Sequence, residues 1–162
     1  MGLNILPIKL NLILKLLKLK IMTESKDFDP YILGICCNWC TYAGADQAGT
    51  SRMQRPANLR IMRVMCGGRV DPQFVLDALT NGVDGVLVSH CHPGDCHYVE
   101  GNYKTIRKMP LLLRYLEQYG INPKRVKYTY VSASEGAELT EIVQEFVQEL
   151  KELGPNPLRV EE

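Results

Sequence analysis

The 162-residue sequence predicts an α/β domain built on an open, mainly parallel four-stranded sheet flanked by helices. Two observations lead to this prediction. Four short apolar runs of strand length alternate with segments in which apolar residues recur at helical spacing. The connections between them are short, which favours parallel strands joined by right-handed crossovers.

The first two strands are predicted from apolar runs that end at turn-forming residues. Residues 31–36 form the first run, and the turn-rich segment 37–52 that follows is expected to be a loop. Residues 59–66 form the second run, which stops at Gly67 and Gly68.

A helix and a third strand follow. Asp71 is a typical N-cap, and Pro72 suits the first helical position. Apolar residues then recur at helical spacing until Gly82, which is placed to end the helix. Residues 84–89 are again apolar and predict the third strand.

The remaining sequence repeats the same alternation. A helix is expected over residues 104–119, and the fourth strand over 125–131. Ser132 and Glu135 have the spacing of a capping box, and a regular apolar stripe follows until Gly154. Four strand–helix units therefore predict a three-layer domain of the flavodoxin or Rossmann type, with right-handed crossovers.

We expect three segments in the chain: an N-terminal extension at 1–29, one α/β domain at 30–153 and a C-terminal tail at 154–162. Lysines interrupt residues 1–21 every few positions, so no membrane span is expected there. The segment also lacks the cleavage pattern of a signal peptide, which favours a cytoplasmic protein. The preferred interpretation is that Met22 is the true start; an amphipathic helix lying on a membrane surface is the alternative.

Composition narrows the classes of function. Hydrophobic residues make up 46% and charged residues 23%, which is typical of a folded globular chain. The formal net charge is +1, so there is no electrostatic case for nucleic acid as a partner.

Five of the six cysteines predict a metal centre. Cys37 and Cys40 form a C-x-x-C pair after the first strand, Cys66 ends the second, and Cys91 and Cys96 follow the third. The carboxyl ends of parallel strands meet at one edge of a sheet, so these thiols are expected to converge there. Four thiolates suit zinc or an iron–sulfur cluster.

The remaining cysteine and the histidines are expected to have other roles. Cys36 adjoins Cys37, so strand alternation turns it to the opposite face and into the core. His90, His92 and His97 are expected to lie around the metal or on the surface, because the thiols already exceed the four ligands needed.

Several catalytic interpretations fail. Gly44 and Gly49 imitate part of a phosphate loop, but the Lys-Ser/Thr ending is absent. No G-x-G-x-x-G follows the first strand, so the dinucleotide fingerprint is missing. Acyl chemistry by Cys91 with a neighbouring histidine remains a minor alternative.

Four segments closely resemble the delta subunit of methyl-viologen-reducing hydrogenase. They are residues 36–46, 60–66, 94–98 and 132–136. The similarity runs from about Ile32 to Phe146 and departs at His90, where a small residue is expected.

The resemblance implies a 2Fe-2S electron-transfer subunit that is not catalytic alone. It would relay electrons from a hydrogenase or formate dehydrogenase to the flavin-containing, electron-bifurcating A subunit of heterodisulfide reductase in methanogenic metabolism. The cysteines that match the family pattern are Cys37, Cys40, Cys66, Cys91 and Cys96. One cluster needs four of them, and the spare one is left open. The alternative function is a structural zinc module that scaffolds a multisubunit complex.

Overall fold

Four parallel strands form one sheet in the order β2-β1-β3-β4. The computed structural model describes residues 28–159, so the expectations about Met22 and residues 1–21 lie outside the described part. The strands are β1 Ile32–Cys37, β2 Leu59–Val64, β3 Gly85–His90 and β4 Val126–Tyr130. The helices are α2 Thr41–Thr50, α3 Pro72–Thr80, α4 Gly101–Gln118 and α5 Gly136–Leu153, with short 3-10 turns η1 Gly67–Arg69 and η2 Pro123–Arg125.

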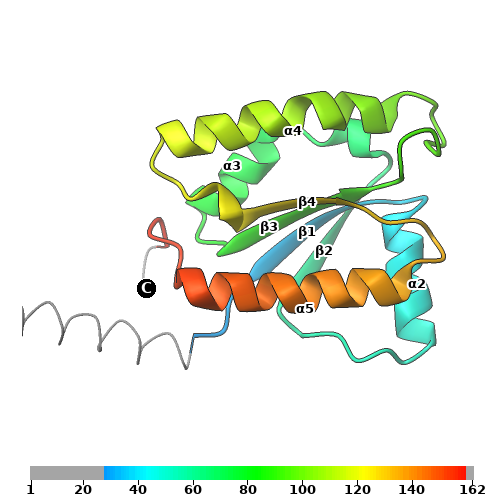
Figure 1. Ribbon diagram of the computed structural model, residues 1–162, viewed down its shortest axis with the longest axis horizontal. Coiled ribbons are helices and arrows are strands. Elements are labelled where there is room, and N and C mark those ends of the chain that lie inside the picture. The colour runs from blue at the N-terminus through cyan, green and yellow to red at the C-terminus, as the bar shows by residue number, and fades with distance from the viewer. Residues whose placement is uncertain (1–27, 160–162) are drawn as a thin grey trace, which may run out of the picture.

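The helices cover both faces of the sheet and complete the predicted three layers. Figure 1 shows α3 and α4 on one face and α2 and α5 on the other. Buried side chains fill each interface: Ile35, Val75, Leu79 and Leu112 on the α3/α4 face, and Ile32, Leu59, Val143 and Phe146 on the α5 face. The predicted fold class is confirmed.

The strand order creates one switch point. The chain leaves β1 toward β2 on one side and then crosses to β3 on the other side of β1. Ligand sites in open parallel sheets lie beyond the carboxyl ends of the strands at such a point. Here that position is the gap after Cys37 at the end of β1 and His90 at the end of β3.

Helix α2 lies in the segment that the sequence predicted as a loop, so that prediction is wrong. Two glycines and two threonines give α2 a poor intrinsic helix propensity, and Cys40 at its N-cap makes no side-chain capping bond. Packing stabilises the helix instead. A Cβ on Gly136 of α5 would lie 2.6 Å from the Gly44 carbonyl oxygen, so glycine at position 136 lets α5 approach the backbone of α2 closely. A Cβ on Gly44 would lie 2.9 Å from the Ser132 carbonyl oxygen, so Gly44 likewise lets α2 approach the loop before α5.

Helix boundaries differ by a few residues. Asp71 caps α3 as predicted, accepting the Gln73 N–H at 3.0 Å. Helix α5 begins at Gly136, later than the expected capping box. Half of that box is nevertheless present, because the Glu135 carboxylate accepts the backbone N–H of Ser132 at 2.7 Å.

One buried carboxylate holds both ends of the domain at the amino edge of the sheet. Asp84 is fully buried, and its two oxygens accept the backbone N–H groups of Tyr31 and Asn156, each at 2.9 Å. The Asn156 amide also donates to the carbonyls of Leu79 and Val83. Residues just after α5, within the predicted tail, are therefore packed on the domain.

None of the helices within residues 28–159 is long and apolar enough to cross a membrane.

Candidate metal centre

The cysteines gather at the carboxyl edge of the sheet, as predicted. Cys37 is the last residue of β1, and Cys40 is the N-cap of α2. Cys66 follows β2 by two residues, Cys91 follows β3 directly, and Cys96 lies in the loop before α4. Parallel register brings these strand ends side by side.

One pair of thiols is in direct contact. The sulfurs of Cys66 and Cys96 lie 3.7 Å apart. Two thiolates bound to one tetrahedral metal at about 2.3 Å lie roughly 3.8 Å from each other. The pair therefore already has the spacing that a shared metal ion requires.

Cys40 and Cys91 are a second pair of neighbouring thiols, across the switch point. Burial raises the pKa of Cys91, and the neighbouring Cys40 raises it further. Burial also raises the pKa of Cys40, against the opposing effect of the Cys91 thiol.

Cys37 lies beside both pairs. It is 1% exposed, and its thiol points to the Met65 carbonyl at 4.0 Å. A negative charge on Cys37 would raise the pKa of Cys40, Cys66 and Cys91, so the five thiols share one electrostatic environment.

Cys36 behaves differently. It is fully buried, and burial raises its pKa to about 12. Alternation along β1 directs its side chain to the face opposite Cys37, where it packs as a small apolar residue.

The N-terminus of α4 favours negative charge on one sulfur. Burial opposes ionisation of Cys96, but the backbone N–H groups of Tyr98, Asn102 and Gly101 donate to its sulfur, and the pKa is lowered overall. Burial raises the pKa of its partner Cys66 to about 11.

Gly101 is a site residue that sequence reasoning missed. A Cβ there would overlap the Cys66 sulfur and lie 3.1 Å from the Cys96 sulfur. Only glycine allows α4 to begin this close to both thiols. The visible signal was a glycine three residues ahead of the expected helix start, which periodicity alone does not interpret.

The histidine rings are engaged away from the thiols. His90 is fully buried; its Nδ1 donates to the Cys91 carbonyl at 2.7 Å, and its Nε2 accepts from the Tyr128 hydroxyl at 2.9 Å. Burial lowers the pKa of His90, consistent with a neutral ring. His92 contacts Glu135, and His97 stacks on Trp39.

The donor set fits a soft metal distributed over two pairs of thiols. Within residues 28–159, no three His, Cys, Asp or Glu side chains surround a single metal position. Thiolates suit either zinc or iron with inorganic sulfide.

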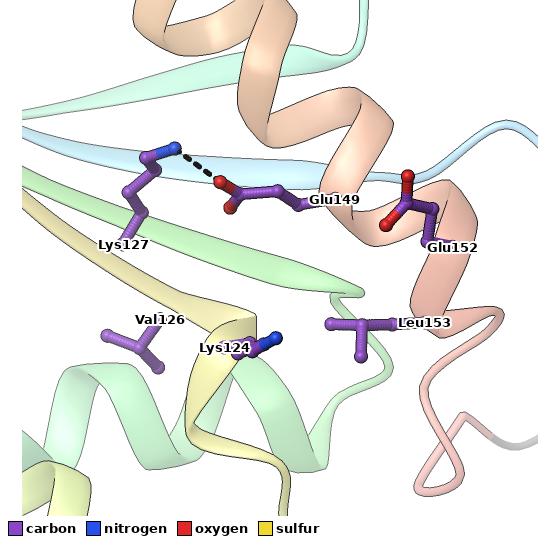
Figure 2. A pocket seen from close by; sticks show the side chains of 6 residues that line it. All are labelled: Lys124, Val126, Lys127, Glu149, Glu152 and Leu153. Carbon is purple, nitrogen blue, oxygen red and sulfur yellow. Dashed lines mark hydrogen bonds and ion pairs between the residues drawn. The ribbon is translucent and has the colours of Figure 1, made fainter.

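A hollow far from the cysteines carries no comparable chemistry. Figure 2 shows it between β4 and the last turns of α5, with a volume of about 420 Å³. Its lining includes Lys127, which pairs with Glu149 at 2.9 Å. Opposite charges that neutralise each other at the surface give no functional signal.

Comparison with known protein families shows which family this chain belongs to. Residues 32–154 match the family described as methyl-viologen-reducing hydrogenase, delta subunit. The chain belongs to this family. The match spans every strand and helix of the domain, including the five clustered cysteines.

Relatives of the delta-subunit family include separate iron–sulfur proteins of hydrogenases. The chain is 49% identical to the iron-sulfur subunit of the F420-non-reducing hydrogenase of Archaeoglobus profundus, over 81% of this chain and 96% of that protein. It is 47% identical to the vhc iron-sulfur subunit of the F420-non-reducing hydrogenase of Methanococcus voltae, over 83% and 94% of the two chains.

The delta-subunit domain also occurs within a much longer protein. The chain is 44% identical to part of the A subunit of the ferredoxin/F420H2-dependent CoB-CoM heterodisulfide reductase of Methanosarcina acetivorans. The match covers 82% of this chain but 17% of that protein. The same domain is therefore covalently joined to a heterodisulfide reductase polypeptide in that organism.

Proposed function

We propose that the chain is a 2Fe-2S electron-transfer subunit in which Cys40, Cys66, Cys91 and Cys96 hold the cluster. The arrangement of the thiols in two close pairs supports this proposal, because a 2Fe-2S cluster places two thiolates on each of its irons. Cys66 and Cys96 would share one iron, and Cys40 and Cys91 the other.

The names of the relatives favour iron and sulfide over structural zinc, because proteins 49% and 47% identical to this chain are called iron-sulfur subunits. The 3.7 Å spacing of the Cys66 and Cys96 sulfurs fits two thiolates on one zinc as well as on one iron, so it does not separate the two metals.

The chain's own residues set the conditions for the cluster. When bound, the cluster supplies the capacity to accept and release one electron at a time. The N–H groups of Tyr98, Gly101 and Asn102 offset negative charge at Cys96. The buried strand ends that carry Cys37 and Cys91 exclude water from one side, since each of these residues is 1% exposed.

We further propose that the donor is a hydrogenase or formate dehydrogenase and the acceptor the A subunit of a heterodisulfide reductase. The names of the separate iron–sulfur relatives support the hydrogenase, and the joined domain of Methanosarcina acetivorans supports the heterodisulfide reductase. A single one-electron centre cannot complete substrate chemistry, so the chain alone is expected to be inactive. We also propose that the complex lies in the cytoplasm.

Metal analysis of anaerobically purified protein tests the cofactor. We expect about two irons and two acid-labile sulfides per chain, with visible absorbance. Stoichiometric zinc without iron would establish the scaffold alternative instead.

Single substitutions test the ligand set. Cys40, Cys66, Cys91 and Cys96 changed to Ala should each lose most of the iron, while Cys36→Ala keeps it. Cys37→Ala should also retain iron, because Cys37 contacts Met65 and belongs to neither pair. If Cys37→Ala lost its iron and one of the other four variants kept it, Cys37 would be a ligand and the cysteine of that variant would be the spare thiol.

A further inference from the structure

A groove leads along the free edge of β2 to the Cys66–Cys96 pair. Strand β2 pairs only with β1, so its outer edge is not covered by another strand in the described part of the chain. The groove has a volume of about 490 Å³. Its floor is apolar and ends at Cys66: Met62, Val64, Met65, Phe74 and Tyr98.

The groove continues into an exposed apolar surface. Met65 is 56% exposed and Tyr98 49%, and Tyr98 packs edge-on against Trp39, which is 41% exposed. Exposed apolar side chains are normally scattered singly over a protein surface, whereas a cluster of them is typical of a protein–protein contact. Here the cluster lies beside the proposed cluster ligands.

Backbone strain supports the same interpretation. Val99 is 74% exposed, yet its φ is +67°, a conformation that β-branched residues rarely adopt. The Val99 N–H donates to the Cys96 carbonyl at 2.9 Å, so the strained residue is hydrogen-bonded to a proposed cluster ligand. Strain of this kind, held in place at an exposed apolar residue, is characteristic of functional sites.

The rim of the groove is positively charged. Arg63 and Arg69 line it together with the apolar residues, and no acidic residue of the described chain lines it. Neither arginine takes part in an ion pair within residues 28–159. Arg63 lies over the Tyr42 ring at 5.0 Å, which orients its side chain without neutralising the charge.

We propose that this groove docks an acidic segment of the redox partner, so that electrons pass through the Cys66–Cys96 end of the centre. The inference rests on the proposed function and specifies the surface through which it operates. The apolar floor supplies the contact area, and the two arginines select a partner with carboxylates around its own redox centre.

Charge reversal tests the rim. The variant R63E/R69E is compared with R114E/K124E, which reverses two exposed charges on the outer part of α4 and in η2. Two purified proteins serve as separate probes: the A subunit of heterodisulfide reductase, and hydrogenase depleted of its own delta-family protein. With one of them, we expect R63E/R69E to associate at least about tenfold more slowly at low salt, with the difference largely lost at high salt.

Photo-crosslinking identifies the occupant. p-Benzoylphenylalanine replaces Met65 in one protein and Leu111, 57% exposed on α4, in the other. We expect the Met65 position to label an acidic segment of one probe. Labelling from Leu111 only, labelling of a second copy of this chain, or labelling of a segment without acidic residues would overturn the proposal.

Iron and sulfide content separates this proposal from the proposed function. Every variant should keep its cluster, because none of the substituted residues is a ligand. Normal clusters with unchanged association in R63E/R69E would refute the docking groove alone, whereas zinc in the unmodified protein would refute the electron-transfer function.

Discussion

A single missing methyl group at Gly101 allows helix α4 to start against two sulfurs. We predict that Gly101→Ala loses most of its bound iron, because the new Cβ overlaps the Cys66 sulfur. The overlap should also lower the free energy of unfolding by about 1–3 kcal/mol. Iron analysis and urea unfolding measure the two effects.

Gly49→Ala is the matched control, because a Cβ there meets nothing within 4 Å and the residue lies in a helix. It should leave the iron unchanged and stabilise the chain by up to about 1 kcal/mol. Equal iron in both variants would remove Gly101 from the site.

Glu135 gives a pH dependence outside the cysteine cluster. The Ser132 N–H, and then the His92 ring, lower its pKa below the usual 4.5. A carboxyl whose pKa is lower in the folded state adds stability above its unfolded pKa and loses it as the pH falls through the folded value. We predict that the stability gap between wild type and Glu135→Gln is greatest near neutral pH and closes below about pH 4.5.

Urea unfolding between about pH 3 and 7 measures the gap, with Glu141→Gln on the exposed face of α5 as the control. His92 is the titratable group that faces Glu135, so the double variant with His92→Gln checks that the carboxyl is responsible. A gap that stays constant over the whole range would contradict the prediction.

At the scale of elements, the contact between α2 and α5 depends on Gly136. Gly136→Ala would place a Cβ 2.6 Å from the Gly44 carbonyl and 3.0 Å from the Ala48 nitrogen. We predict a loss of about 1–3 kcal/mol in unfolding free energy and weaker iron binding, because Cys40 is the N-cap of α2 and would move with it. Ala137→Ser, at the exposed neighbour, should change stability by no more than about 0.5 kcal/mol. A stable Gly136→Ala protein with full iron would show that α2 tolerates displacement.

The strands and α3 were predictable because local chemistry decides them. Asp71 and Pro72 set the start of α3, and all four strands form within a residue or two of their expected limits. Strands β1 and β3 are almost wholly buried, whereas β2 and β4 are mostly half-buried. Helix α2 was not predictable, because its residues have low helix propensity. It is stabilised by packing against α5, which lies about 90 residues away in the sequence. Long-range packing of this kind leaves no periodic signal in the segment itself.

The candidate site was also predictable only in part: the cysteines that form it could be identified, but not the distances between them. Spacing places five cysteines at one sheet edge, but the pairing of Cys66 with Cys96 crosses 30 residues and depends on how closely α4 approaches. The proposal that Cys37 is the spare thiol likewise depends on its orientation toward the Met65 carbonyl. Sequence alone therefore identifies the set of thiols, whereas their distances from one another depend on the tertiary structure.

At the scale of the whole molecule, Asn156 secures the segment that follows α5. Its amide donates to the Leu79 and Val83 carbonyls at 2.8 and 2.7 Å, in a buried position. We predict that Asn156→Ala lowers the unfolding free energy by about 2–4 kcal/mol, since it leaves buried carbonyls unpaired. Iron content should not change, because the cysteines lie at the opposite edge of the sheet.

Glu152→Gln, an exposed change on the same end of α5, is the control for this prediction and should remain within about 0.5 kcal/mol of wild type. Thermal or urea unfolding decides the result. An Asn156→Ala protein as stable as the control would restrict the folding unit to the predicted 30–153.

The two oxygens of Asp84 bind the backbone just before β1 and just after α5, so the first and last parts of the described fold meet at one carboxylate. A short connecting peptide between them would suffice for circular permutation, with new termini opened in a surface loop. Because its two ends lie close together, the domain can also be inserted into a longer polypeptide without disturbing its fold. The joints would then lie at the edge of the sheet opposite the carboxyl ends of the strands, which carry the cysteines (Figure 1).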